Sequence, residues 1–385
     1  MQAPPDYMDR LLAALDPEKA GDISEFVKDA VRTVPRHLFV PHVGLVDPYG
    51  REPYLIDRRT DPSAWWDAVG SVEPIVTQLD DGRTPLAAAP PSYNSSSSSS
   101  SPATVADFLN HLAPEPGMRV LDVGTGTGWT AGLLSHLAGQ ENVVSIEVDQ
   151  AVSDEAAKNL AAAGLRPHLV VGDGAAGYPA LGPYDRIHVT CGIRDIPYAW
   201  VEQCRPEAVI VLPWHPGFGA SHALRLEVLG DGTAQGRVVG GAAYMMMRSQ
   251  RLRPDREPEQ EEDRRDYWSA LDPRALDALS AGADLAISAL TGLHSHVQSY
   301  PEGDGERLRM WVSDPGDARR WAIAVWRPGQ TRHAVHQVGD RPVWDEVLHA
   351  YARWVELGEP HWSDFGVTVT QDGTRIWLGS PENVL

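Results

Sequence analysis

Cysteine is scarce in this sequence, and its number and spacing exclude several classes of protein. Among 385 residues only Cys191 and Cys204 occur. They are too few for a zinc cage or a disulfide framework and too far apart for a C-x-x-C redox pair. We interpret both as free, buried thiols.

Long apolar runs are also absent. No run approaches the roughly 20 residues that a membrane-spanning helix needs. The first residues show no basic segment followed by an apolar one, which a secretory signal would have. We therefore expect a soluble, cytoplasmic protein that makes no contact with a membrane, and we favour a monomer.

Basic residues are outnumbered by acidic ones. The sequence has 33 Lys and Arg against 53 Asp and Glu, so its formal net charge is −20. A field of this sign repels a phosphate backbone. Because Lys and Arg are also scattered along the chain, we expect no nucleic-acid partner.

The length favours more than one domain, since single hydrophobic cores stop growing at roughly 250 to 300 residues. We predict a helical lead-in and an ordered, irregular insertion over residues 1–91 and a core over residues 92–252. Residues 253–266 are charged and nearly without apolar side chains, as a linker should be. Residues 267–385 hold eight of the 13 tryptophans and a terminal hairpin pattern, and we expect them to form a separate α+β domain.

Within residues 92–252, strand patterns alternate with helical ones. The strands read MRVLDVG, NVVSIEVD, PHLVVGDG, YDRIHVTCG and EAVIVLPW, and the helices between the first three read TAGLLSHLAG and AVSDEAAKNLAAAG. This alternation predicts an α/β core whose parallel sheet is covered on both faces. The later ALRLEVLGDGTAQGRVVGG predicts a hairpin that adds antiparallel strands at one edge.

A glycine-rich loop follows the first of these strands. Gly124, Gly126 and Gly128 stand between a strand and a helix, where absent side chains let a ligand lie against the backbone. Trp129 occupies the place where a dinucleotide fingerprint has its third Gly or Ala, and Asp122 closes the strand. A carboxylate there is a poor neighbour for pyrophosphate and a good one for a cation.

Two further acidic residues end the next two strands. Glu147 lies about 20 residues past the loop, where an acidic side chain accepts hydrogen bonds from both ribose hydroxyls. Asp173 ends the third strand in the same way. Because ligands bind at the carboxyl ends of open parallel sheets, these strand ends together predict a nucleoside site.

Several longer motifs carry a resemblance to a known family. In order, VPRHLFVP, SPATVADFLNHL, VLDVGTGTGWTAGLLSHL, VVGDGAAGYP, PYDRIHVTCGIRDIP and VIVLPW resemble the protein-L-isoaspartate O-methyltransferase family over roughly residues 20–250. The resemblance implies a Rossmann-like class I fold and S-adenosyl-L-methionine as cofactor. It implies that Gly124, Thr125 and Gly126 face the methionine part, Glu147 the ribose and Asp173 the adenine amino group. The cofactor-binding residues expected in all are Asp122, Gly124, Thr125, Gly126, Glu147, Asp173 and Gly174.

Seven serines, Ser95–Ser101, precede Pro102. From composition alone such a run is typical of a flexible linker. The family carries a short Thr/Ser-Ile-Ser-x-Pro segment here, and the resemblance implies that Ser98 and Ser100 are its catalytic hydroxyls, with serine in place of isoleucine at Ser99. The substrate-binding residues expected beside them are Ser99, Ser101, Pro213 and Trp214. Since a carboxylate is already ionised at neutral pH, the chemistry needs no strong base, and we expect no metal, not even at His294 to His296.

The chain also departs from a simple repair enzyme of the family. It continues well beyond AAYMMMRSQR, has a long insertion after Pro41, and carries serines throughout the motif. These features resemble the branch associated with lanthipeptides and graspetides. The resemblance implies methylation of an aspartate side chain in a cyclised, ribosomally made precursor peptide, leading to succinimide (aspartimide) or isoaspartate. General isoaspartate repair is the alternative, and a non-catalytic peptide-binding module is a second.

Overall fold

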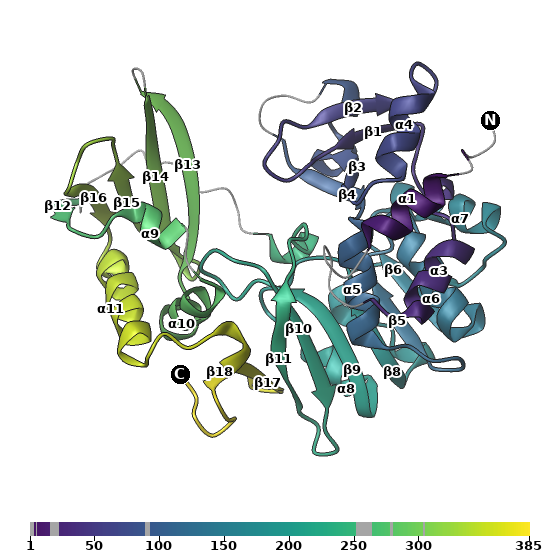
Figure 1. Cartoon of the computed structure of the whole chain (residues 1–385). Helices are drawn as coiled ribbons and strands as arrows, with labels where there is room; N and C mark the ends of the chain where they lie inside the picture. Colours follow the sequence, from purple (N-terminus) through teal and green to yellow (C-terminus); the bar gives the residue numbers. More distant parts are fainter. Residues whose placement is uncertain are drawn as a thin grey trace.

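The computed structural model describes residues 4, 6–15, 23–88, 93–251, 264–277, 280–302 and 305–385. Within these ranges the strands form three sheets of nine, four and five strands. Figure 1 shows the nine-stranded sheet at the centre, with the four-stranded sheet above it on one side and the five-stranded sheet on the other. No helix in the described ranges is long and apolar enough to span a membrane.

The central sheet has the order β18-β17-β11-β10-β9-β8-β5-β6-β7. From β7 to β9 neighbouring strands run parallel, and from β9 to β18 they run antiparallel. The predicted class I methyltransferase fold with an antiparallel edge is therefore confirmed. The strands are β5 (Val120–Val123), β6 (Val143–Glu147), β7 (His168–Val171), β8 (Tyr184–Val189), β9 (Cys204–Trp214), β10 (His222–Val228), β11 (Ala234–Gly241), β17 (Phe365–Thr370) and β18 (Gly373–Leu378).

Helices cover both faces of this sheet, which explains its almost continuous apolar strands. The N-terminal helices α1 (Tyr7–Ala14) and α3 (Glu25–Thr33) pack with α5 (Pro102–Leu112) and α6 (Trp129–Ala138) in one core. On the other face, α8 (Tyr198–Glu202) contributes the buried Trp200 to a second core. Helix α7 (Gln150–Ala162) contacts β6 and β7.

The region after Pro41 is more regular than expected. Instead of an irregular insertion, it forms three strands, β1 (Val43–Val46), β2 (Tyr54–Asp57) and β3 (Ile75–Leu79), with helix α4 (Pro62–Val69). The strands are four or five residues long, too short for their alternation to stand out in the sequence. Trp65 and Trp66 of α4 supply much of their core.

The serine run is the fourth strand of this small sheet. Residues Ser95–Ser99 form β4, which pairs antiparallel with β3 and places Ser98 opposite Val76. Pro102 then begins α5, where its missing N–H costs no hydrogen bond. The described part of the run is therefore a strand and a helix start rather than a linker.

The chain after the charged segment forms a five-stranded antiparallel sheet in the order β12-β16-β15-β14-β13. One face packs on helices, because Leu308, Val312 and Val335 share a core with Val347. The elements are β12 (Arg265–Ser269), α9 (Pro273–Asp277), α10 (Ala281–Thr291), β13 (His294–Glu302), β14 (Gly305–Asp314), β15 (Asp317–Trp326), β16 (His333–Val338) and α11 (Val343–Glu356).

The terminal hairpin does not belong to this five-stranded sheet. We expected it inside a separate domain over 267–385, but β17 pairs with β11 and extends the central sheet. Arg237 of β11 reinforces the junction by donating to the carbonyl oxygens of Ser363, Asp364 and Gly379. The sequence pattern of a hairpin says nothing about which sheet it joins, and the placing of the hairpin was wrong for that reason. The boundaries 1–91 and 92–252 stay predictions, and most of the expected linker 253–266 lies outside the described residues.

Candidate functional site

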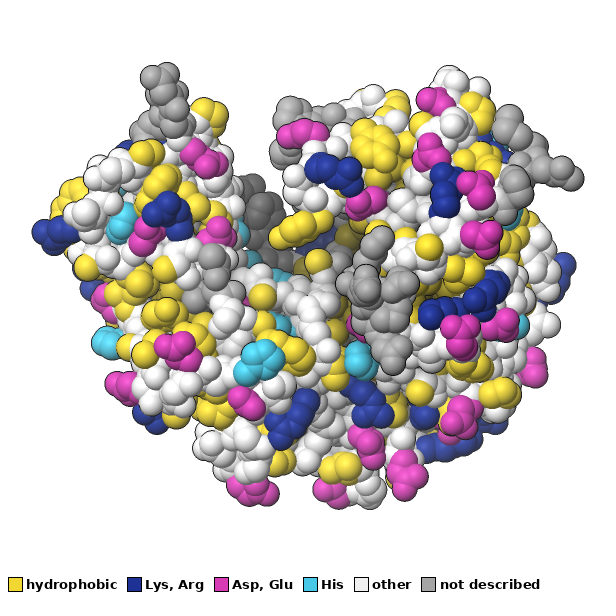
Figure 2. All heavy atoms as spheres, in the orientation of Figure 1, with side chains coloured by type: hydrophobic (Ala, Val, Ile, Leu, Met, Phe, Trp, Pro, Cys, Tyr) yellow, Lys and Arg dark blue, Asp and Glu magenta, His cyan; other side chains and the backbone are white. Residues whose placement is uncertain are grey.

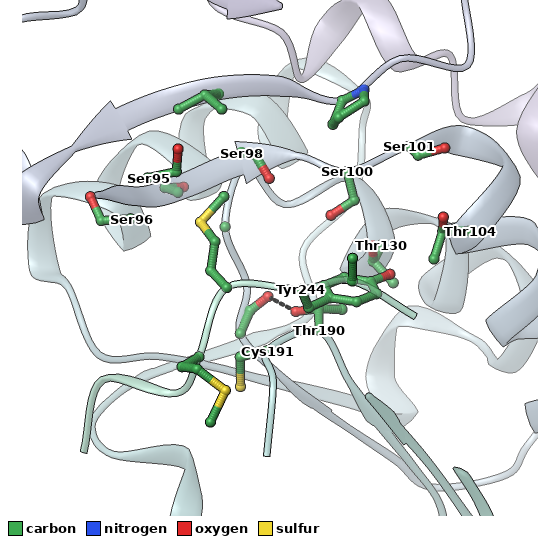
Figure 3. A pocket seen from close by; sticks show the side chains of 18 of the residues that line it. Ser95, Ser96, Ser98, Ser100, Ser101, Thr104, Thr130, Thr190, Cys191 and Tyr244 are labelled. Atoms are coloured by element: carbon green, nitrogen blue, oxygen red, sulfur yellow. Dashed lines mark hydrogen bonds between the residues drawn. The ribbon is translucent and has the colours of Figure 1, made fainter. Parts of the chain in front are cut away.

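A cavity of about 820 Å³ opens at the carboxyl ends of β5, β6 and β8. The glycine loop after β5 forms one wall, which we call the glycine wall (Gly124–Thr127). The serines Ser98, Ser100 and Ser101, which we call the serine wall, line it as well, and the carbonyl oxygen of Ser98 lies 3.4 Å from the position that a Cβ of Gly126 would take. Figure 3 shows the hydroxyl groups of Ser98 and Ser100 on the side of the strand that faces Thr190 and Tyr244. The cavity volume lies in the range of small-molecule sites.

The glycine wall adopts backbone conformations that residues with a side chain rarely adopt. Gly124 has φ +98°, and a Cβ there would lie 2.5 Å from Oγ1 of Thr190. Gly126 has φ +53°, and its N–H donates to Oε2 of Glu147 at 3.0 Å. Side chains are therefore excluded where a ligand must approach the backbone.

The two acidic strand ends lie where the sequence placed them. Glu147 lines the cavity, is 8% exposed, and also accepts a hydrogen bond from the N–H of Asp149 at 3.1 Å. Burial raises its pKa, while the two backbone N–H groups oppose the rise. Asp173 lines the cavity with Gly174 and accepts from the N–H of Ala175. A buried acceptor beside a side-chain-free loop fits the ribose and the methionine part of S-adenosylmethionine.

Asp122 does not line this cavity, contrary to the expectation that it contacts the cofactor. Its side chain is 0% exposed, with Oδ1 3.0 Å from Nδ1 of His188 and Oδ2 accepting from Oγ of Ser145. The Ser145 hydroxyl is in turn 2.7 Å from Oγ1 of Thr125. Asp122 lies inside β5, one residue before the strand ends, so its side chain is buried on one face of the sheet and does not reach the cavity. Through Ser145 it supports Thr125 of the glycine wall.

Three of the expected substrate residues also lie outside the cavity lining. Ser99 is 1% exposed and its Oγ accepts from Nε of Arg36 at 3.2 Å. Pro213 pairs with Ala223 in the sheet. Trp214 is 2% exposed and donates from Nε1 to the carbonyl oxygen of Arg194. Only Ser101 of that set lines the cavity.

Several residues that line the cavity were not predicted from the sequence. Thr130, Thr190 and Tyr244 add hydroxyl groups near the serine wall. Burial raises the pKa of Tyr244, and within the described residues its buried hydroxyl has no hydrogen-bond partner. The quoted motif PYDRIHVTCG contains Thr190, so its place after a strand was a signal for it. Tyr244 follows an antiparallel strand, and no spacing rule indicates it.

The arginines that line the cavity are paired with acids. Arg51 donates to Glu73 at 2.6 Å, and Arg251 donates to Asp81 at 2.8 Å. Arg248 contacts Asp81 and Asp149 at 3.2 and 3.3 Å. The positive charge of each of these arginines is therefore offset by a neighbouring carboxylate.

The cysteines and histidines add no metal centre to the described ranges, where no group of three or more His, Cys, Asp and Glu could hold an ion. Both cysteines are free. Both are only partly buried, so the expectation of buried thiols is wrong, and Cys191 lines the cavity. Burial raises its pKa, which keeps the thiol protonated and unreactive.

A parallel sheet with a glycine loop, an acidic residue ending the next strand and a cavity beside both define a class I S-adenosylmethionine-dependent methyltransferase. A family model described as protein-L-isoaspartate(D-aspartate) O-methyltransferase (PCMT) matches residues 76–251. The protein-L-isoaspartate O-methyltransferase of Methylorubrum extorquens is 32% identical over 219 residues, which cover 57% of this chain and 78% of that enzyme. The chain belongs to the protein-L-isoaspartate O-methyltransferase family, whose members are S-adenosylmethionine-dependent carboxyl methyltransferases.

Two further similarities describe the extent of the match. The enzyme of that name from Pyrococcus horikoshii is 38% identical over 150 residues, which span 38% of this chain and 66% of the relative. A solved structure titled protein-L-isoaspartate O-methyltransferase has a TM-score of 0.54 at 20% identity, and the match covers 97% of this chain and 100% of that one. At this identity the likeness shows the fold alone, and it extends over the region after residue 252.

Proposed function

We propose that this chain transfers a methyl group from S-adenosylmethionine to the side-chain carboxylate of an aspartate-derived residue in a polypeptide. The observation that carries the proposal is that two walls of different chemistry line one cavity. The glycine wall, with Glu147 and Asp173, suits the cofactor, and the serine wall offers hydroxyl donors to a carboxylate. The intact cofactor wall argues against a non-catalytic binding module.

The residues of the site need only bind the substrate and the cofactor and orient them for methyl transfer. Bound S-adenosylmethionine supplies the methyl group, so that an O–CH₃ bond forms as an S–CH₃ bond breaks and no proton moves. The side chains of Ser98 and Ser100 donate hydrogen bonds to the carboxylate, which is ionised at neutral pH. Holding its oxygen at near-attack distance is worth several orders of magnitude in rate.

For the substrate, we propose an aspartate in a cyclised, ribosomally made precursor peptide of the lanthipeptide or graspetide kind. The serine wall in place of the family's mixed motif supports this substrate. So does the hollow that Figure 2 shows between the four-stranded and the five-stranded sheet. After methylation the next backbone nitrogen attacks the ester and expels methanol, which closes a succinimide (aspartimide).

General repair of isoaspartate is the second candidate. A specific observation favours it, because the fold likeness to a solved protein-L-isoaspartate O-methyltransferase covers 97% of this chain. The five-stranded sheet is therefore no mark of a peptide-modifying branch.

A substrate comparison tests both candidates. The purified full chain is incubated with S-adenosylmethionine and either a cyclised precursor peptide encoded beside its gene, the linear precursor, or a linear isoaspartyl peptide. Mass spectrometry should show one added methyl on the cyclised peptide, then a product one water lighter than the start, with hydroxylamine trapping the succinimide. Faster methylation of the isoaspartyl peptide would make the chain a repair enzyme. Methylation of none of the three would contradict carboxyl transfer.

A further inference from the structure

Arg36 is a fully buried arginine whose contacts are unusual for its charge. It begins a short 3₁₀ turn, Arg36–Leu38, and its side chain is 0% exposed. Within the described ranges no carboxylate lies in ion-pair contact with it. Every hydrogen bond it makes there ends on a backbone carbonyl or on the Ser99 hydroxyl. Burial lowers its pKa, yet an arginine stays charged at neutral pH.

The guanidinium joins the end of the serine strand to a neighbouring turn. Nη2 donates to the carbonyl oxygens of Ser99 and Ser100, each at 3.2 Å, and Nε donates to Oγ of Ser99. Donors on Nη1 and Nη2 also reach the carbonyl oxygens of Val69, Ser71 and Glu73, at 3.3, 3.0 and 2.9 Å. The planar fork of arginine provides five N–H donors in a fixed geometry, which lysine cannot reproduce.

The same guanidinium also lies against the cofactor side of the cavity. Its central carbon is 5.8 Å from the centre of the Trp129 ring. Trp129 is the first residue of α6, directly after the glycine wall, and its Nε1 donates to the carbonyl oxygen of Val34. One side chain therefore contacts the serine strand, the Val69–Glu73 turn at the rim and the residue that follows the glycine wall.

We propose that Arg36 is a positioning residue, which fixes the backbone at Ser99 and Ser100 and so holds the serine wall at its distance from the glycine wall. A serine run has no apolar side chain to pack, and its antiparallel pairing with β3 contains two register shifts, between Val76 and Gln78 and between Gln78 and Leu79. Such a strand is weakly specified by its own sequence. Displacement of a reacting group by about 1 Å lowers turnover by about a hundredfold. The inference rests on the proposed function only for its effect on turnover.

The test compares Arg36→Lys with Arg186→Lys in the full chain. Arg186 is a matched control because its described hydrogen bonds also end only on backbone carbonyls, those of Leu112, Ala113 and Asp185, and because it lies outside the cavity lining. Three readouts are needed: amide hydrogen exchange over residues 95–101, calorimetric affinity for S-adenosylhomocysteine, and turnover per folded enzyme.

For Arg36→Lys we expect exchange over residues 95–101 to rise at least about tenfold. Affinity for S-adenosylhomocysteine should stay within about threefold, and kcat should fall about tenfold or more. For Arg186→Lys, exchange over residues 95–101 and kcat should match the wild type. A rise in exchange spread evenly over the chain in Arg36→Lys, or wild-type turnover by the folded variant, would overturn the proposal.

Two provisions keep the test decisive. If Arg36→Lys does not fold, Ser99→Ala removes only the acceptor of the Nε bond, and it should raise exchange over residues 95–101 and lower kcat a few-fold. Unchanged values for both would overturn the proposal. If the wild type methylates no polypeptide, the proposed function fails, but the exchange data, measured without substrate, still decide whether Arg36 positions the serine wall.

Discussion

The two walls of the cavity are built in different ways. The geometry of the glycine wall follows from its own residues, since Gly124 and Gly126 adopt positive φ and Glu147 holds the N–H of Gly126. In the serine wall, the serine side chains do not themselves specify the conformation of the backbone. It is placed by distant residues, through strand β3 and through Arg36. A segment can therefore carry function while the information that shapes it lies elsewhere in the chain.

The largest effect is expected from a side chain on the glycine wall. In Gly124→Ala the new Cβ would lie 2.5 Å from Oγ1 of Thr190, and the residue would keep a φ of +98° that L side chains rarely adopt. Because such strain costs of order 1–3 kcal/mol before any clash, affinity for S-adenosylhomocysteine should fall by about a hundredfold or more in calorimetry. Gly230→Ala, in open space at ordinary φ, is the control. Equal affinities for the two variants would show that the glycine wall does not bind the cofactor.

The next effect should appear on the serine wall alone. In Ser98→Ala/Ser100→Ala, turnover should fall about a hundredfold, since misplacement of the reacting oxygen by about 1 Å costs about that factor. Cofactor affinity should stay unchanged, because we assign these hydroxyls to the substrate carboxylate and the glycine wall to the cofactor. Steady-state kinetics and calorimetry measure the two quantities, with the exposed Ser299→Ala as control. Near-normal turnover would return the serine run to a purely structural role.

This difference between the walls also explains what the sequence could predict. Strand ends and glycine spacing are local signals, and Glu147, Asp173 and the loop do line one cavity, while their binding of the cofactor stays a prediction. Asp122 was misplaced because a strand-end carboxylate can point either way, and only the contacts with His188 and Ser145 decide. Arg36 lies in the motif VPRHLFVP, but its proposed role depends on carbonyl oxygens up to 64 residues away in the sequence. Pairings over such distances, like that of β17 with β11, have no local signature.

A smaller effect is expected from the acidic end of β6. Glu147→Ala removes the carboxylate proposed for the ribose and frees the N–H of Gly126. Hydrogen bonds to charged groups are worth about 1.5–3 kcal/mol, so affinity for S-adenosylhomocysteine should fall about ten- to hundredfold. Asp173→Ala should weaken binding as well. Unchanged affinity in both variants would remove the nucleoside part of the ligand from these strand ends.

The smallest effect concerns pH and separates the walls by their chemistry. The pKa of Glu147 is raised by burial, whereas serine hydroxyls do not titrate near neutral pH. Ribose hydroxyls donate to the ionised carboxylate, so affinity for S-adenosylhomocysteine should fall as the pH drops through the raised pKa of Glu147, and Glu147→Gln should flatten that dependence. The stability of the ligand-free protein depends on pH in the opposite direction. The folded state holds the proton more tightly than the unfolded state, so this group's contribution to stability is present below its unfolded pKa and is lost as the pH rises through the folded one. Calorimetry measures the pH dependence of affinity, and thermal unfolding that of stability, between about pH 4 and 8. Ser98→Ala should retain both dependences. Equal pH dependence of affinity in Glu147→Gln and in the wild type would show that another titrating group controls cofactor binding.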